Sequence, residues 1–256
     1  MIPALLRQEV RALLRARRTR LAAGIVLYAV LGAPFLLAKP PQHVAEAAAT
    51  WFSGDPAFAL FLFIWTDLAL NKMAAILGVV LAGGIVREDQ ARGLLPLLWA
   101  KPIGKAQYYL VKLAAAAIVF TLLLGGAALL GLALFPWQVA GFRAAPFLLV
   151  SLVHLVGALF AVSLSGLVAL LVPRRLTAML TSLVLLMLLV GTAFLGFYVP
   201  AWAGWAALNP FYQAVWLLGQ LDALTLAVAA RPLAILLLVH AVTVALGALA
   251  VRRVEA

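Results

Sequence analysis

The sequence contains no cysteine, which excludes disulfide bonds, thiolate metal sites and cysteine nucleophiles together. Charge is also scarce, because only 11% of the 256 residues are charged whereas 67% are hydrophobic. A soluble domain of this length needs more polar side chains to cover its outer surface. Lipid must therefore surround most of the chain, so that backbone polar groups pair internally. Long Leu, Ala and Val runs without two-residue alternation favour helices over a barrel.

Several enzyme motifs are missing as well. No G-x-x-x-x-G-K-[ST] loop is present, because Gly104-Lys105 lacks the earlier glycine, so the chain does not bind ATP in the P-loop manner. Neither H-E-x-x-H nor G-x-S-x-G occurs, and the histidines His43, His154 and His240 are isolated from one another. We therefore expect no catalytic residue, no metal site and no cofactor bound by this chain.

A membrane-spanning helix needs about 20 mostly apolar residues, and the sequence offers six such segments. We expect an all-α integral membrane protein with a single transmembrane domain, residues 1–256. Its spans are predicted at about 21–38, 62–86, 110–135, 146–172, 176–199 and 232–251. Only Pro173-Arg174-Arg175 separates the fourth and fifth spans, which predicts a tight hairpin.

The net charge of +11 is better explained as a signal for membrane orientation than as a nucleic-acid surface. With the N-terminus in the cytoplasm, six spans place 15 of the 19 Lys and Arg residues on the cytoplasmic side. An odd number of spans would break this asymmetry. We therefore expect both termini in the cytoplasm, the chain in the inner (plasma) membrane, and no nucleic-acid partner.

Residues 1–20 are predicted to form an amphipathic helix rather than a cleaved signal peptide, since the basic region is long and no small-residue cleavage site follows. Arginines recur opposite an apolar face, an arrangement that suits the inner leaflet, where Arg meets lipid phosphate. Pure membrane anchoring and an additional role in protein docking remain equally open. The apolar face consists of Ile2, Leu5, Leu6, Val10, Leu13 and Leu14.

Two segments outside the predicted spans are long. Residues 39–61 contain three prolines and a glycine and are predicted to form a loop with one short helix. Residues 200–231 contain Trp202, Trp205 and Trp216, which match an interfacial aromatic belt. We expect this second segment to form one or two short helices on the outer surface.

Ionisable groups at membrane depth are costly and therefore candidates for function. Asp67, Asn71, Lys72 and His154 are the candidates for a substrate pathway. The alternative for the first three is a helix that begins near Ala69 and leaves the charges at the headgroups. The alternative for His154 is a hydrogen bond to a neighbouring helix.

The fourth predicted span carries small residues at strict four-residue spacing, which allows close approach of another helix. The pattern predicts a packed contact, either within the subunit or at a dimer interface. The residues are Gly157, Ala161, Ser165 and Ala169.

Residues 87–105 form a polar island between the second and third spans, charged at its start and basic at its end. A plain loop would not need the apolar run in its middle, so we expect something outside the membrane to bind it. The alternative is a helix that lies in the lipid interface. The run consists of Leu94, Leu95, Leu97, Leu98 and Trp99.

This island resembles the segment between spans two and three of the ABC type-2 transporter permease family. There, acids precede a glycine, a Leu-rich short helix, a basic-Pro pair and a basic residue that opens the next span. The matching residues here are Glu88, Asp89, Gly93, Leu95, Leu97, Leu98, Lys101, Pro102 and Lys112. The basic opening at residues 7–15 and Asn209-Pro210 are also similar. Leu94 departs from the family's frequent Thr, and Pro96 is expected to interrupt the short helix.

The resemblance implies a permease subunit of an ATP-driven transporter, and an exporter. Residues 87–105 would then be the coupling segment, in which the island's acids, Gly93, the apolar run, Lys101 and Pro102 contact a separate P-loop ATPase that holds ATP and Mg. A second permease copy would complete the pathway, as a homodimer rather than a heterodimer. ATP hydrolysis would drive either translocation or conformational signalling.

Two other classes remain as alternatives. A membrane enzyme or assembly factor without an ATPase would need clustered catalytic groups, whereas those in this sequence are scattered. A secondary transporter would usually show internal repeats and ionisable coupling sites. The sequence does not identify the substrate.

Overall fold

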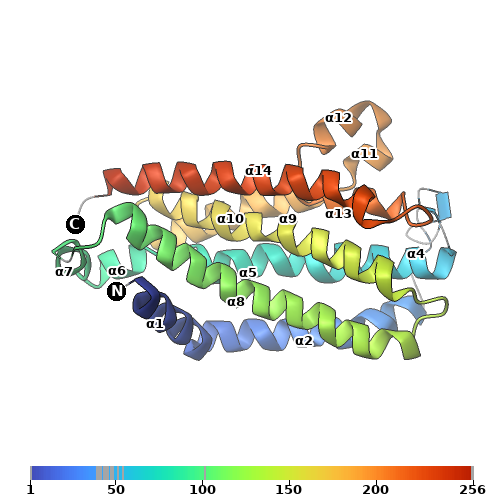
Figure 1. Cartoon of the computed structure of the whole chain (residues 1–256), viewed down its shortest axis with the longest axis horizontal. Helices are drawn as coiled ribbons and strands as arrows, with labels where there is room; N and C mark the ends of the chain where they lie inside the picture. The colour runs from blue at the N-terminus through green and yellow to red at the C-terminus, as the bar shows by residue number, and fades with distance from the viewer. Residues whose placement is uncertain are drawn as a thin grey trace.

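The structure is a computed structural model that describes residues 2–38, 42, 46, 49, 50, 52, 53, 55–100 and 102–254. It is 82% helical, and the described residues contain no strand. Figure 1 shows a bundle of long helices that run roughly along one axis, with both ends of the chain at the same end of the bundle. We call this the terminal end, and the opposite end, where α4 begins, the far end.

Four helical stretches among the described residues are long and apolar enough to cross a membrane. They are Pro56–Ala91, Lys105–Trp137, Ala144–Leu171 and Leu226–Arg253. A shorter apolar helix, α10 (Arg175–Gly191), has 17 residues, and α2 (Arg17–Ala38) has 22. These stretches indicate a membrane-spanning protein.

Helix α9 (Ala144–Leu171) occupies the centre of the bundle. It packs against α5 (Lys72–Ala82), α8 (Lys105–Leu134), α10 and α14 (Leu226–Ala250). Helix α2 lies along α8 and α5. The connection between α9 and α10 is only three residues long, as Pro173 in the sequence led us to expect.

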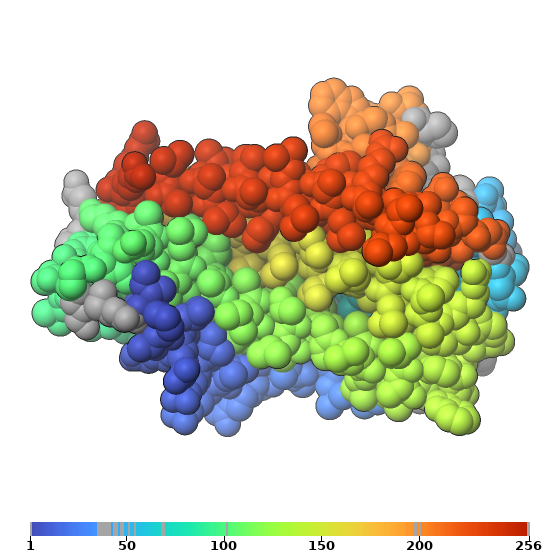
Figure 2. Space-filling model, in the orientation of Figure 1, coloured from blue at the N-terminus to red at the C-terminus, as the bar shows by residue number. Residues whose placement is uncertain are grey.

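The N-terminal segment is divided at Ala16. Helix α1 (Ile2–Arg15) ends there and α2 begins at Arg17, so one predicted helix over residues 1–20 is too long. Most of the apolar face of α1 packs on the protein itself, mainly on α8, with Leu13 buried and Leu5, Leu6 and Val10 partly buried. Ile2 and Leu14 are exposed. Figure 2 shows α1 in blue against the side of the bundle. This helix therefore serves as a docked element of the fold.

The second apolar stretch begins earlier than predicted. Helix α4 (Pro56–Phe63) starts six residues before Leu62, because Asp55 accepts hydrogen bonds from the Ala57 and Phe58 N–H groups, both at 3.0 Å. Pro56 occupies the first helical position, where no N–H is needed. Part of the predicted loop 39–61 is therefore helix, while residues 39–41, His43 and several neighbours lie outside the described residues.

The fifth predicted span is too long and the sixth begins too late. Helix α10 ends at Gly191, because Thr192 and Asn209 satisfy its last carbonyl groups; the Asn209 Nδ2 donates to the Leu189 oxygen at 2.7 Å. Helix α14 begins at Leu226 behind the cap residue Thr225 and carries Pro232 inside its first turns.

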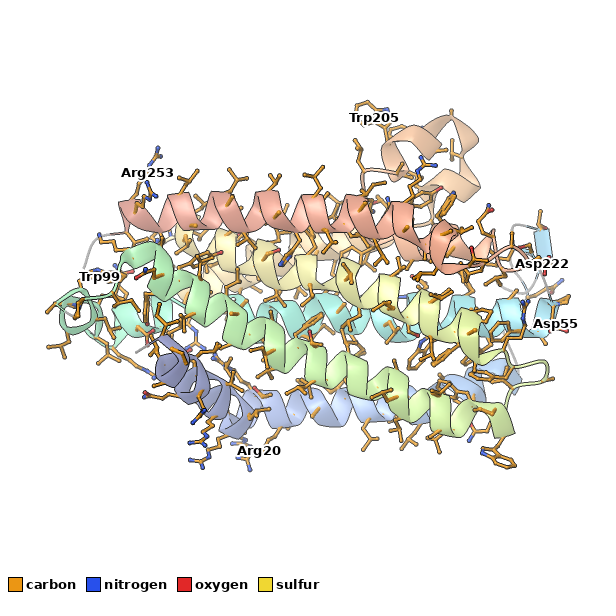
Figure 3. The ribbon with its side chains drawn as sticks, viewed as in Figure 1. Arg20, Asp55, Trp99, Trp205, Asp222 and Arg253 are labelled. Atoms are coloured by element: carbon orange, nitrogen blue, oxygen red, sulfur yellow. The ribbon has the colours of Figure 1, made fainter. Side chains whose placement is uncertain are left out.

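The segment between these two helices does not all lie on the outer surface. Helices α11 (Leu195–Tyr198) and α12 (Ala203–Ala206) stand out sideways from the bundle, and Trp205 points away from it (Figure 3). Helix α13 (Tyr212–Leu218) is instead buried against α9, α14 and α4. The prediction of surface helices is wrong for α13, because its residues 211–218 fill the bundle rather than its rim.

Candidate functional site

The coupling segment lies at the terminal end as two short helices, α6 (Arg87–Ala91) and α7 (Leu95–Trp99). Gly93 divides them with a left-handed backbone, φ 67°. Its N–H donates to the Gln90 oxygen and the Leu94 N–H donates to the Asp89 oxygen, which is the Schellman arrangement that closes a helix. Glycine adopts this φ without steric cost, so Gly93 sets the angle between α6 and α7.

Pro96 does not interrupt α7. It lies in the first turn, where a missing N–H breaks no helical hydrogen bond, so the expected interruption is wrong. The divide between the two helices falls at Gly93 instead.

The apolar run on α7 has an inner and an outer side. Leu95 is fully buried, whereas Leu97 is 66% exposed and Leu94 37% exposed. Leu98 and Trp99 are half-buried, and the Trp99 ring packs edge-on against Tyr108 at 5.6 Å. Leu95 and Trp99 thus fix α7 to the bundle, and we call exposed Leu94, Pro96 and Leu97 the α7 tip. Pro102 is exposed, and Lys101 lies outside the described residues.

Asp89 does not face outward. Its carboxylate is buried, forms an ion pair with Lys112 at 2.6 Å and accepts a short hydrogen bond from the Tyr108 hydroxyl. Lys112 also pairs with Glu9 of α1 at 3.2 Å. Three segments, α1, α6 and α8, therefore meet on one ammonium group.

The Glu88 carboxylate pairs with three guanidinium groups, two of them from other segments. Arg18 of α2 lies 3.1 Å from its carboxylate, Arg92 2.8 Å and Arg175 of α10 3.9 Å. The two acids of α6 thus tie the coupling segment to α1, α2, α8 and α10. We call these residues the inner ion network: Glu9, Arg18, Glu88, Asp89, Arg92, Lys112 and Arg175.

Backbone contacts add two more ties at the terminal end. Arg87 donates to the carbonyl oxygens of Ala169 and Leu170, at 3.0 and 2.8 Å, at the end of α9. Lys105 donates to the Val254 oxygen at 2.7 Å and lies over the Trp99 ring. The coupling segment is therefore connected to most of the helices that could move with it.

Sequence reasoning did not assign Glu9, Arg18, Tyr108 or Arg175 to this site. One local signal was present, because Tyr108 and Lys112 are four residues apart and share a face of α8. Glu9 was also the only acid in a strongly basic N-terminal segment. The pairs with Arg18 and Arg175 join residues 70 and 87 positions apart and carry no local signal.

The polar residues of the second apolar stretch lie deep within it. Residues Ile64–Asn71 form a stretch of π-helix, η1, between α4 and α5. Asp67 pairs with Lys72 at 3.3 Å, and the helix begins 11 residues before Asp67, about 16 Å along the axis. A helix that begins near Ala69 is therefore wrong. Single π turns inside helices often mark functional positions.

Asn71, the last residue of this π-helix, and His154 of α9 are both buried. The Asn71 amide atoms have no hydrogen-bond partner among the described residues, and the buried His154 ring lies against the Leu70 backbone. His154 lines a groove of about 410 Å³ between α8 and α9, together with Leu70, Gly125, Ser151 and other residues. Figure 2 shows a hollow between these green and yellow helices. The four pathway candidates therefore lie on or beside one stretch of helix.

The small residues of α9 lie inside the chain. All four, Gly157, Ala161, Ser165 and Ala169, are buried. A side-chain carbon at Gly157 would lie 2.9 Å from the Pro210 oxygen, and one at Gly78 of α5 would lie 2.6 Å from the Ala161 side chain. The ladder thus serves close packing within the subunit.

The described residues contain no group of three or more His, Asp or Glu side chains that could hold a metal ion. Neither a protein-family model nor a curated protein matches the chain.

Proposed function

We propose that this chain is the membrane-spanning permease subunit of an ATP-driven ABC transporter, and an exporter. It crosses the plasma membrane six times with both termini in the cytoplasm, and a separate P-loop ATPase binds ATP and Mg at the terminal end. The proposal rests on the α7 tip, where Leu94 and Leu97 are exposed while Leu95 on the other side of α7 is buried. Helix α7 lies at the terminal end of the bundle (Figure 1). A small apolar projection of this kind fits a groove in a partner protein.

The inner ion network would transmit a movement of the coupling segment to the other helices. A displacement of α6 and α7 acts on α1 and α8 through Asp89 and Lys112, and on α2 and α10 through Glu88. Arg87 adds α9 through its carbonyl contacts. Movement of a docked ATPase would thus reach five helices at once and alter access to the pathway.

A second copy of the chain would account for Lys72. Its side chain is 43% exposed although it lies deep in the apolar stretch. A charged group at the bilayer centre costs about 2.5–3.5 kcal/mol or more. Another copy beside η1 would enclose Lys72, Asp67 and a polar path between the two subunits.

The test is association with any P-loop ATPase whose gene is found next to the gene of this chain, with the two proteins co-expressed and purified in detergent. Leu94→Asp combined with Leu97→Asp should abolish both co-purification and any stimulation of ATP hydrolysis by the permease. Since both residues are exposed, the variant should fold. Trp137→Asp is the matched control, because Trp137 is 89% exposed at the far end of α8.

Intact association in the leucine variant would contradict docking through the α7 tip. Loss of association in both variants would show a general defect instead. If wild-type permease neither binds nor stimulates the ATPase, an ATPase-independent assembly factor or secondary transporter becomes the better description.

A further inference from the structure

A pocket of about 390 Å³ lies under the coupling segment, between α1, α2, α6, α8 and α10. Its walls combine apolar side chains such as Leu13 and Ile85 with eight charged ones. The charged residues are Glu9, Arg17, Arg18, Glu88, Asp89, Arg92, Lys112 and Arg175.

The charges of this pocket do not balance. Five cationic side chains face three carboxylates, so the pocket keeps a net charge of +2. Lys112 faces two carboxylates, those of Asp89 and Glu9, so these three groups together carry a net charge of −1. The excess therefore falls around Glu88, whose single carboxylate is shared by Arg18, Arg92 and Arg175.

Arg17 increases the imbalance. It lines the same pocket and forms no ion pair within the described part of the chain. Four guanidinium groups from three segments thus converge where one carboxylate is available. The planar guanidinium group donates two parallel hydrogen bonds to oxyanions that offer two acceptor oxygens, such as carboxylates and phosphates.

The position of the pocket limits what the anion can be. Arg17 and Arg175 are the first residues of α2 and α10, so the pocket lies at the level where these apolar helices begin. In a membrane, this is the level of lipid phosphate groups. The adjacent apolar walls would accept the first carbons of a lipid.

We propose that this pocket binds the phosphate of an acidic lipid headgroup, such as phosphatidylglycerol. The phosphate bridges Arg17 and Arg175 and shares Arg18 and Arg92 with Glu88. It thereby joins α2 and α10 to the coupling segment. Free inorganic phosphate has the same binding chemistry and is the other source to test. The proposal does not depend on the presence of an ATPase.

The experiment uses the whole purified chain in a neutral detergent, titrated with phosphatidylglycerol or phosphatidylcholine and observed by native mass spectrometry. Wild type should bind one phosphatidylglycerol at a concentration at least tenfold below that needed for phosphatidylcholine. Arg17→Gln with Arg175→Gln should remove this preference, because each cation near an anionic lipid contributes roughly fivefold.

Arg252→Gln with Arg253→Gln is the matched control. It removes the same charge at the same end of the bundle, from exposed residues that do not line this pocket. The control should keep the preference. Equal losses in the two double variants would overturn the proposal, because only general surface charge would then attract the lipid.

A third variant is expected to strengthen lipid binding, which a folding defect would not do. Glu88→Gln removes the carboxylate that competes for the arginines, so it should tighten phosphatidylglycerol binding by about fivefold. Weaker binding would overturn the proposed geometry. If millimolar inorganic phosphate displaces the lipid and binds wild type equally well, the lipid source is wrong.

Discussion

The two ends of the bundle are held together by different physics. At the terminal end, the inner ion network joins α1, α2, α6, α8 and α10 through charged groups, of which Asp89 and Lys112 are almost buried and the others partly exposed. At the far end, stacked and edge-on rings join α4, η1, α9 and the turn η2 (Phe135–Trp137). The rings are Phe58, Phe61, Trp65, Phe135, Phe142 and Phe147.

In the proposed transport mechanism, this difference identifies the end of the bundle that moves. Arg18, Arg92 and Arg175 already share one carboxylate, so they can exchange partners at small cost when α6 shifts. The rings are close-packed and buried, and close-packed side chains do not deform continuously. We infer that the terminal end yields to the coupling segment while the far end acts as its pivot.

The largest expected effect is at the far end. Phe147→Ala removes a fully buried ring that contacts Phe61, Trp65 and Phe135, and should cost about 3–5 kcal/mol of the free energy of unfolding. Thermal unfolding in detergent should show a Tm about 6–20 °C lower.

Phe147→Leu is the control, since it keeps most of the volume and should cost less than about 1.5 kcal/mol. High salt should not change either value. A loss below 1 kcal/mol for Phe147→Ala would show that the far end is loosely packed, and the pivot would then have no basis.

The second effect is at the terminal end. Asp89→Asn keeps the shape of the side chain but leaves Lys112 with Glu9 alone, and should cost about 2 kcal/mol. Adding Lys112→Met should lower the free energy of unfolding further, because it removes the remaining ion pair between Lys112 and Glu9 and leaves Glu9 without a partner. A double variant that is more stable than Asp89→Asn would contradict this explanation.

The third effect is smaller and depends on salt. Glu88→Gln releases three partly exposed guanidinium groups and should cost about 1 kcal/mol or less at low salt. The difference from wild type should shrink at 0.5 M salt, where screening is strong. A loss that is unchanged by salt would show that Glu88 acts through packing instead.

The smallest effect on stability is at the α7 tip. Leu97→Asp changes a side chain that is 66% exposed, so the free energy of unfolding should stay within about 0.5 kcal/mol of wild type. A large loss of stability would show that Leu97 packs within the protein, and the tip would then not be free to bind a partner.

The long helices could be predicted from the sequence because hydrophobic length alone defines them. The central helix was expected at 146–172 and runs over Ala144–Leu171. The signals at Asp55 and Pro56, an N-cap before a first-turn proline, were present in the sequence and were overlooked. They move the start of the second apolar stretch and place Asp67 deep inside it.

Other features could not be predicted from local sequence. Helix α13 carries the aromatic residues of an interfacial belt, yet contacts with α9 and α14 bury it. Glu88 and Asp89 resemble an exposed acidic rim, but Gly93 and cations from distant segments turn both carboxylates inward. Which side of a five-residue helix packs against the protein depends on its contact partners, because so short a helix shows no hydrophobic periodicity of its own.

The most direct test of the account is a pair of distance measurements in the proposed complex of this chain with a P-loop ATPase. Because the chain has no cysteine, spin labels can be placed at Ala100 and Arg174 for the terminal end, and at Trp137 and Leu224 for the far end. Addition of ATP and Mg should shift the distance at the terminal end and leave the far-end distance unchanged. An equally large shift of the far-end distance, or no shift of the terminal-end distance, would contradict the claim that the terminal end moves while the far end stays fixed.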